Sequence, residues 1–304
     1  MGMMARNWRP DGQFSLPQTL APFRRGKGDP TWFLAPDQAI WRGIRSPIGA
    51  TTVRLKQDAG LVLAQAWGAG AEWVLSQLPI ALGAGDQPEH FRPQHPVLTE
   101  LARRHPGLRL GASGLVLEAL IPAIIEQKVT GREAFAAQAR LVRRHGEPAP
   151  GPGADLGLWV PPDPETLSGL TSWQWAELGI TPLRVQTLHR VLSHRNRLAD
   201  SGALTSAELD QLLRQVPGVG VWTSAETRAR VLGDPDAISF GDYHVGRNIG
   251  WALVGEPLDD EALEQVLRPY EGQRYRVQRL VELGGFRPPR RGPRRSLPRH
   301  LPGM

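Results

Sequence analysis

The chain has 304 residues, of which 40% are hydrophobic and 22% are charged, and this balance is typical of a folded globular protein of roughly one to three domains. It excludes a chain that is disordered throughout, which needs lower hydrophobicity and a less balanced charge. No window approaches the roughly 18 consecutive apolar residues of a membrane span, and the first residues lack the apolar stretch of a secretory leader, so we expect neither. The absence of cysteine excludes a disulfide framework, a thiol nucleophile, an iron–sulfur cluster and a cysteine-bound zinc ion. We therefore expect a cytoplasmic protein.

Basic residues gather at the end of the chain. Residues 286–304 contain no acidic residue and six arginines, which are Arg287, Arg290, Arg291, Arg294, Arg295 and Arg299. The formal net charge of the whole chain is +6, which these six arginines account for, so the rest of the molecule has no net charge. The segment is rich in proline and has no apolar periodicity, which predicts a disordered Arg/Pro-rich tail that binds an anionic polymer. A tail that only raises solubility is the alternative.

The first part of the chain predicts a small α+β domain over residues 1–93. Residues 51–57 and 60–67 alternate between apolar and polar and are bounded by glycines, which indicates an antiparallel hairpin or meander. A short apolar helix is expected from Ala71 to Leu82, and the stretch from Gln87 to Pro93 reads as a linker. Five of the ten tryptophans lie in this part, which favours a core of its own: Trp8, Trp32, Trp41, Trp67 and Trp73.

The pattern after residue 93 predicts a single all-helical domain over residues 94–285. The start signals of its helices are Ser113 before an apolar run to Gln127, Thr130 with Glu133 before a helix that stops at Gly146, Thr181-Pro182, and Thr205 with Glu208 before a helix up to Gln215. Residues 147–164 are rich in proline and glycine and are expected to be a loop. The fold class is therefore α+β, mainly α, with an N-terminal antiparallel sheet followed by helices.

The segment from Leu213 to Ala225 carries a hairpin motif. A capped helix runs into Pro217-Gly218-Val219-Gly220, and a new helix begins near Trp222. Two glycines two residues apart permit a tight turn whose N–H groups can approach a phosphate, and the second helix directs its positive end the same way. This arrangement is a helix-hairpin-helix, which clamps the DNA backbone without reading the sequence. An ordinary connection between two helices is the alternative.

An aspartate follows the hairpin at a fixed distance. Asp242 comes 22 residues after Gly220, in the turn Ser239-Phe-Gly-Asp-Tyr-His-Val245. The helix that follows carries Val245, Ile249 and Ala252 on one face. The spacing predicts that Asp242 lies in the first helical turn, where the helix dipole and free N–H groups favour the ionised carboxylate. A helix cap without further function is the alternative.

Hairpin and aspartate together resemble the helix-hairpin-helix DNA glycosylase superfamily, and within it the 3-methyladenine DNA glycosylase II branch, over about residues 30–285. The segments that carry the resemblance are the Trp-rich start, Ile124–Thr130, Val216–Thr223 and Phe240–His244. The resemblance implies an enzyme that flips a damaged base out of double-stranded DNA and hydrolyses its N-glycosidic bond, with Asp242 as the catalytic carboxylate. It also implies that the hairpin residues Pro217, Gly218, Val219, Gly220 and Thr223 hold the DNA backbone. No cofactor is required, although the backbone carbonyls of Arg214, Val216 and Gly218 are expected to suit a structural monovalent cation.

The resemblance assigns four further side chains. Gln127 and Lys128 match the turn that fills the gap left by the flipped base, with a solvated loop lysine as the alternative. Trp222 matches a tryptophan of the base pocket, although a tryptophan at this place on a helix is also a common core residue. Glu226 occupies the position where the branch carries an aromatic ring. Its carboxyl group is expected to accept a hydrogen bond from an N–H group of the flipped base, or to act as a protonated general acid. The alternative for Glu226 is a surface residue paired with Arg230 at i+4.

An alkylated purine is the expected lesion, because such a base already carries positive charge and leaves without acid assistance. The same scaffold acting on deaminated or oxidised bases is one alternative, and a DNA-binding protein without catalysis is another. Asp242 favours the enzyme, since backbone binding needs no acid there. We also expect a monomeric, nucleoid-associated enzyme. It is expected to be monofunctional, because the only lysines are Lys27, Lys56 and Lys128, and the stretch from Glu208 to Val216 just before the hairpin has none to form a Schiff base. The eight histidines show no metal-ligand spacing.

Overall fold

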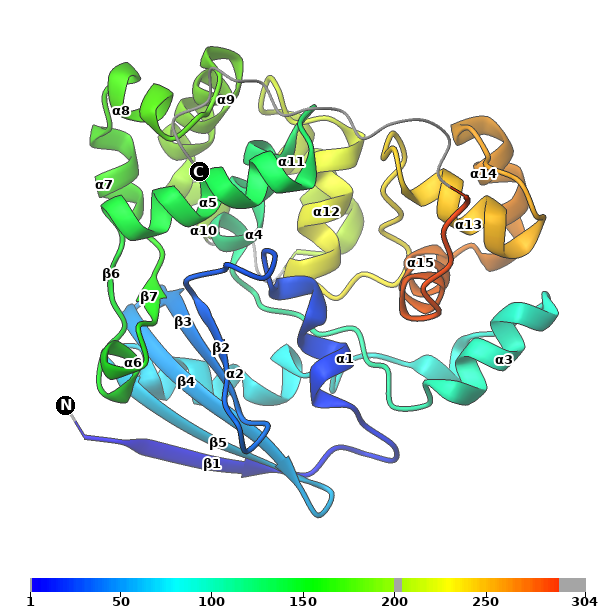
Figure 1. The fold of residues 1–304 in the computed structure, drawn as a ribbon, viewed down its shortest axis with the longest axis horizontal. Coiled ribbons are helices and arrows are strands. Elements are labelled where there is room, and N and C mark those ends of the chain that lie inside the picture. The colour runs from blue at the N-terminus through cyan, green and yellow to red at the C-terminus, as the bar shows by residue number, and fades with distance from the viewer. Residues whose placement is uncertain (1, 200–203, 290–304) are drawn as a thin grey trace.

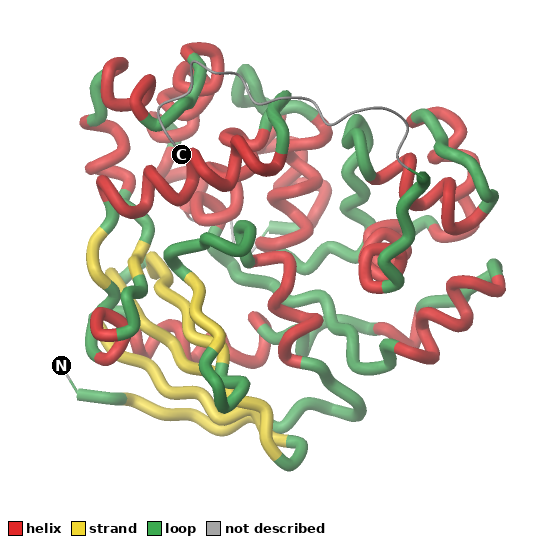
Figure 2. Tube along the Cα trace, in the orientation of Figure 1, coloured by secondary structure: helices red, strands yellow, loops and turns green. Residues whose placement is uncertain are grey.

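The computed structural model describes residues 2–199 and 204–289 and confirms an α+β fold that is mainly helical. Most of the predicted tail, including Arg290, Arg291, Arg294, Arg295 and Arg299, lies outside these residues. Figure 1 shows a sheet at one corner of the molecule and helices over the rest, and Figure 2 shows that the strands are confined to that corner. None of the helices in the described ranges is long and apolar enough to span a membrane.

The sheet has five antiparallel strands in the order β1-β5-β4-β3-β2. The strands are β1 (Met4–Trp8), β2 (Trp32–Leu34), β3 (Ile40–Ser46), β4 (Gly49–Asp58) and β5 (Leu61–Gly68). The predicted strands 51–57 and 60–67 correspond to β4 and β5, apart from Gly60, which belongs to the turn. The two strands pair through this turn at Ala59-Gly60, where both residues have positive φ. One face of the sheet packs on α1 (Leu16–Leu20) and α2 (Ala71–Ala81) around a core that contains Val53, Val62 and Leu75.

The remaining helices form two packed groups. The first group surrounds α4 (Val116–Glu126), whose Leu120, Ile124 and Ile125 are fully buried. Its other members are α5 (Gly131–His145), α7 (Pro164–Gly169), α8 (Ser172–Glu177), α9 (Pro182–Ser193), α10 (Arg195–Ala199), α11 (Ser206–Arg214) and α12 (Val221–Val231). The second group has its own core and consists of α3 (Pro96–Arg104), α13 (Val245–Leu253), α14 (Asp260–Leu267) and α15 (Arg274–Leu283). Short 3-10 helices cover 21–23, 88–90 and 268–270.

Most of the predicted helix starts are confirmed. Thr130 with Glu133 and Thr205 with Glu208 form complete capping boxes, and Pro182 is the first residue of α9. The start of α4 differs, because its N-cap is Leu115 and the Ser113 hydroxyl instead accepts a hydrogen bond from the Leu115 N–H at 3.2 Å.

The segment 147–164 is more ordered than the predicted loop. It contains a two-strand antiparallel ladder of β6 (Glu147–Pro148) and β7 (Trp159–Val160), with the short helix α6 (Pro152–Asp155) between them. Strand β7 crosses close to the sheet, since a Cβ atom on Gly43 would lie 2.0 Å from the Trp159 carbonyl oxygen. This segment is ordered by contacts with residues that are distant in the sequence. Its local composition therefore did not reveal the two strands and the helix.

Candidate active site

The predicted hairpin lies between α11 and α12. Gly218 has a φ of +99°, and a Cβ atom there would lie 2.2 Å from the Thr187 hydroxyl oxygen, so glycine is required both by the backbone and by the close approach of α9. Arg190 donates from Nη1 to the Pro217 carbonyl at 3.1 Å. Val219 is buried in the helical core, which anchors the turn from inside. The hairpin therefore presents its backbone, not its apolar side chain, at the surface.

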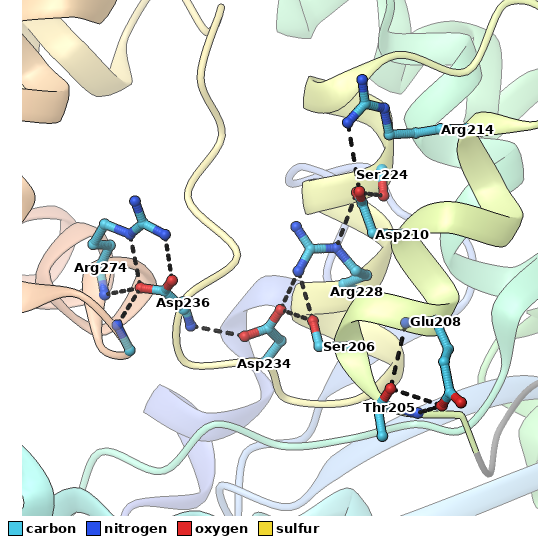
Figure 3. Close-up of polar contacts among 11 residues, drawn as sticks. Thr205, Ser206, Glu208, Asp210, Arg214, Ser224, Arg228, Asp234, Asp236 and Arg274 are labelled. Carbon is cyan, nitrogen blue, oxygen red and sulfur yellow. Dashed lines mark hydrogen bonds and ion pairs between the residues drawn. The ribbon is translucent and has the colours of Figure 1, made fainter.

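A polar network braces the two helices of the hairpin (Figure 3). Ser224 on α12 donates to Asp210 Oδ1 on α11 at 2.6 Å, and Arg228 reaches both Asp210 and Asp234. Asp236 in turn binds Arg274 at the start of α15. These bonds connect α11, α12, α15 and the segment 234–236, which leads to the Asp242 turn.

The turn between α4 and α5 lies beside the hairpin. Gln127 donates from Nε2 to the Gly218 carbonyl at 2.9 Å and to the Thr223 hydroxyl at 2.8 Å. The neighbouring Lys128 is exposed and has a φ of +55°, the left-handed conformation that few residues other than glycine adopt. Gln127 thus connects the predicted gap turn to the hairpin, while Lys128 is the side chain that projects into solvent.

Thr223 and the predicted cation ligands are engaged within the protein. Thr223 as a whole is only 2% exposed, and its hydroxyl accepts a hydrogen bond from Gln127, so the protein itself encloses this residue. The Val216 carbonyl accepts the Val219 N–H at 3.0 Å, and the Gly218 carbonyl accepts Gln127. The chain itself therefore supplies hydrogen bonds to two of the three carbonyl groups that were predicted to bind a cation. These two are the carbonyl groups of Val216 and Gly218, and the third is that of Arg214. The described residues hold no group of three or more His, Cys, Asp or Glu side chains that could bind a metal ion.

Asp242 precedes α13 instead of lying within it. The prediction of the first helical turn is wrong by a few residues, because the N-cap is His244 and Gly241, with a φ of +84°, turns the chain just before the aspartate. The carboxylate nevertheless meets the free end of the helix: Oδ1 accepts the N–H groups of His244 and Val245 at 2.7 and 3.1 Å. Oδ2 accepts the indole N–H of Trp222 at 3.1 Å, which joins the aspartate to the hairpin helix.

Asp242 lines a cavity of about 180 Å³ between the two helical groups. Glu226 and Arg230 of α12 line it from one side, and α15 lines it from the other with Tyr275, Gln278 and Arg279. The residues of α15 were not predicted. Their only signal in the sequence is a helical spacing of polar residues, and the structure shows that this polar face is buried.

Glu226 is a buried, ion-paired residue. It is 9% exposed, so its interpretation as a surface residue is wrong, whereas the predicted pair with Arg230 is confirmed with Oε2 and Nη1 at 2.7 Å. The Ser239 hydroxyl donates to its other carboxylate oxygen. Burial by itself raises the pKa of Glu226, but the charge of Arg230, the Ser239 hydroxyl and the charge of Arg25 outweigh burial and lower it below the ordinary value. A lowered pKa opposes the predicted role as a protonated general acid.

Trp222 lies next to the catalytic candidate, with its ring half-buried at the start of α12. The residues that line the Asp242 cavity do not include it. Trp222 therefore holds the carboxylate through its N–H, and the wall of the cavity is built by α12, α13 and α15.

The chain is similar to known DNA-repair proteins in part of its sequence and in its fold. No protein-family model matches the chain. Two strains of Mycobacterium tuberculosis have a probable bifunctional transcriptional activator/DNA repair enzyme AlkA that is 27% identical over 171 residues, which cover 55% of this chain and 33% of the relative. The chain thus spans about a third of the length of the curated relatives it matches.

Solved structures match almost the whole fold. A 3-methyladenine DNA glycosylase from Archaeoglobus fulgidus superimposes with a TM-score of 0.77 at 20% identity, covering 92% of this chain and 99% of that one. An 8-oxoguanine glycosylase/lyase from Clostridium acetobutylicum gives 0.68 at 12% identity, covering 91% and 95%. The predicted resemblance is therefore confirmed: this chain has the fold of the helix-hairpin-helix DNA glycosylases and is similar to their 3-methyladenine glycosylase branch.

Proposed function

We propose that this chain is a DNA glycosylase of base-excision repair, with Asp242 as its catalytic carboxylate. The observation that carries the proposal is the position of Asp242, which lies at a cavity and is held by two backbone N–H groups and by an indole N–H from the hairpin helix. A DNA-binding module that has lost catalysis needs no carboxylate there. The fold, shared with glycosylases along most of the chain, adds support.

The proposed reaction begins with a base flipped out of duplex DNA, at a cost of a few kcal/mol. The hairpin N–H groups and the positive end of α12 hold a phosphate of the damaged strand, and Lys128 enters the gap in the duplex with its apolar stem. As the N-glycosidic bond breaks, the sugar gains oxocarbenium character, which the Asp242 carboxylate stabilises while it orients the attacking water. No step of this reaction requires a metal ion or cofactor.

The lesion in this proposal is an alkylated purine. At the cavity, the Asp242 carboxylate is held by neutral donors only, and this carboxylate favours a cationic base by simple attraction. A second candidate is a neutral deaminated or oxidised base. The polar wall favours this candidate, because Gln278, Arg279 and Tyr275 offer several hydrogen-bonding groups.

Single-turnover excision on duplexes with one lesion each tests the function and ranks the two candidates. The panel contains 3-methyladenine, hypoxanthine and 8-oxoguanine, with undamaged duplex as control. We expect release of the alkylated base first. No release of any base would contradict the proposed activity, and preferential release of hypoxanthine or 8-oxoguanine would favour the second candidate.

The proposed enzyme is monofunctional. None of the residues that line the Asp242 cavity is a lysine, so no amine is placed there to form a Schiff base with the sugar. Borohydride added during excision should trap no covalent protein–DNA adduct. An adduct that disappears in Lys128→Ala would assign lyase chemistry to the gap turn instead.

A further inference from the structure

The N-terminal domain carries a basic loop at residues 24–28, with the sequence Arg24-Arg25-Gly26-Lys27-Gly28. The loop follows the 3-10 helix at 21–23 and precedes β2. Arg24, Lys27 and Gly28 are exposed, whereas Arg25 is buried. The exposed part of this basic loop thus presents two cationic side chains to the solvent.

Buried contacts fix the shape of the basic loop. Asp29 is 7% exposed, and its Oδ2 accepts the backbone N–H of Arg25 at 2.7 Å. Its Oδ1 accepts the N–H and the hydroxyl of Thr31 at 2.9 and 2.7 Å. Gly26 has a φ of +78°, and a Cβ atom there would lie 2.7 Å from the Phe135 ring of α5, so this position requires glycine. The basic loop is therefore held in place by a buried carboxylate and by the close approach of α5.

The same contacts place the basic loop beside two parts of the proposed reaction. The buried Arg25 donates from Nη1 to Oε1 of Glu126 at 2.8 Å, and Glu126 directly precedes the gap turn at 127–130. At its other end, the loop begins two residues after Pro22, which lines the Asp242 cavity. The basic loop is thus connected to the turn proposed to enter the duplex and to the cavity proposed to hold the flipped base.

No carboxylate neutralises the two exposed cations. Within residues 2–199 and 204–289, neither Arg24 nor Lys27 has an acidic partner. Arg24 donates to the carbonyls of Gly26 and Lys27 at 3.1 and 3.4 Å, and a guanidinium group has further N–H donors for a ligand. The two carboxylates that the loop contacts, those of Asp29 and Glu126, are occupied by the hydrogen bonds above. The uncompensated charge at the surface of the loop suits a polyanion.

We propose that the basic loop binds backbone phosphates of duplex DNA next to the damaged base, through Arg24 and Lys27. The inference rests on the proposed function, because it takes the gap turn to enter the duplex. Phosphates follow one another at about 3.4 Å along each strand, so cations beside the gap turn would meet phosphates within about five nucleotides of the lesion. Such contacts hold and orient the duplex without reading its sequence. The N-terminal domain would then bind DNA together with the hairpin of the helical part.

The salt dependence of DNA binding tests the contact. Arg24→Ala combined with Lys27→Ala, in the full chain, is compared with wild type on a duplex that contains one abasic-site analogue, by fluorescence anisotropy at several salt concentrations. We expect affinity at about 0.1 M salt to fall roughly tenfold, and the slope of log affinity against log salt to decrease by about 1.8, because each lost phosphate contact removes about 0.9.

The matched control removes the same charge elsewhere. Arg9, just after β1, and Arg143, in the last turn of α5, are exposed and also lack an acidic partner in the described part of the chain. Arg9→Ala combined with Arg143→Ala should leave affinity and slope nearly unchanged. An equal loss in both double variants would show that only net charge matters, and an unchanged slope in the loop variant would exclude the contact; either result overturns the inference.

A single introduced thiol locates the basic loop on the DNA. The chain contains no cysteine, so Lys27→Cys offers one attachment point for an iron chelate whose hydroxyl radicals cut the nearby backbone. We expect cuts within about five nucleotides of the abasic analogue, and no such cluster from the same chelate on Arg143→Cys. Uniform cutting, or none, from Lys27→Cys would contradict the proposed position of the loop.

Excision is measured separately from binding, so the two proposals can fail independently. Excision by the wild-type chain together with an unchanged salt slope in the loop variant contradicts only this inference. A reduced slope and clustered cuts, without release of any base, contradict only the proposed function. Tighter binding of an RNA duplex of the same sequence, with the larger loss of slope on RNA, would assign the basic loop to RNA and overturn the inference.

Discussion

Two regions place a carboxylate at the same cavity in different ways. Asp242 lies in the turn before α13, and its hydrogen bonds come from neutral groups, two backbone N–H groups and one indole. Glu226 lies in the middle of α12, buried against Arg230 and Ser239. The Asp242 carboxylate is therefore oriented by neutral donors and has no ion-pair partner among the described residues, whereas an adjacent cation neutralises the charge of Glu226. A shared cavity does not imply a shared role.

This difference predicts that activity depends on Asp242 and stability on Glu226. A positioned charge acts on a transition state without being needed for the fold. Removing one member of a buried ion pair, by contrast, leaves the other charge buried without compensation. Substitutions in the two regions should consequently affect different measurements.

The largest effect is expected for Asp242→Asn. The amide retains the shape and accepts the backbone N–H groups, but it has no charge to stabilise the oxocarbenium-like sugar. We expect single-turnover excision to fall by about 10²–10⁴-fold, with duplex binding nearly unchanged. Asp260→Asn, which alters another carboxylate near the same turn, serves as control. Excision at the original rate in Asp242→Asn would exclude the aspartate as the catalytic group.

Glu226→Gln should mainly reduce stability. The substitution leaves the Arg230 guanidinium buried without its counter-charge, and we expect a loss of about 3 kcal/mol in the free energy of unfolding, measured with urea. Glu100→Gln removes an exposed carboxylate paired with Arg103 and Arg104 and should change stability little. A stable Glu226→Gln protein with an altered ranking of lesions would instead show that Glu226 reads the base.

The stability difference between wild type and Glu226→Gln should depend on pH. The pKa of Glu226 in the folded protein is lowered from the ordinary value of 4.5, so its contribution is complete well above that pH. The contribution is lost as the pH falls below 4.5 and through the folded-state pKa. Urea unfolding at pH 7 and at successively lower pH values below 4.5 should show the two proteins converging, and a gap that stays constant would refute the lowered pKa.

Trp222→Phe tests the link between hairpin and aspartate. Loss of the indole N–H frees one side of the Asp242 carboxylate, and we expect the excision rate to fall on the order of tenfold while duplex binding stays the same. Trp173→Phe removes a similar indole bond, to Glu177 on the exposed helix α8, and provides the matched control. Equal effects of both substitutions would indicate a general loss of stability.

The smallest effect is expected for Lys128→Ala. If Lys128 fills the gap left by the flipped base, excision from duplex DNA should fall roughly fivefold, because an unfilled gap makes flipping more costly. Excision from single-stranded DNA should not change, since no gap forms there. Lys56→Ala, within the sheet, is the control. An equal loss on both substrates would remove Lys128 from the gap.

Local signals in the sequence determined much of this protein. Capping boxes at Thr130 and Thr205 identify helix starts because the cap bonds join residues only three apart. The hairpin at Gly218 and the spacing to Asp242 are likewise short-range features, and they led to the fold and to the candidate catalytic residue. The location of Asp242 before α13 differed because Gly241 turns the chain first.

Only the tertiary structure decided what surrounds these residues. Gln127 reaches the hairpin across 91 positions of sequence, and α15 contributes the far wall of the Asp242 cavity. The environment of Glu226 also depends on Ser239 and Arg25, which no pattern within α12 reveals. Burial and charge pairing are set by elements that pack from elsewhere in the chain. For this reason the sequence left open whether Glu226 faces the base or the surface, while the fold encloses it.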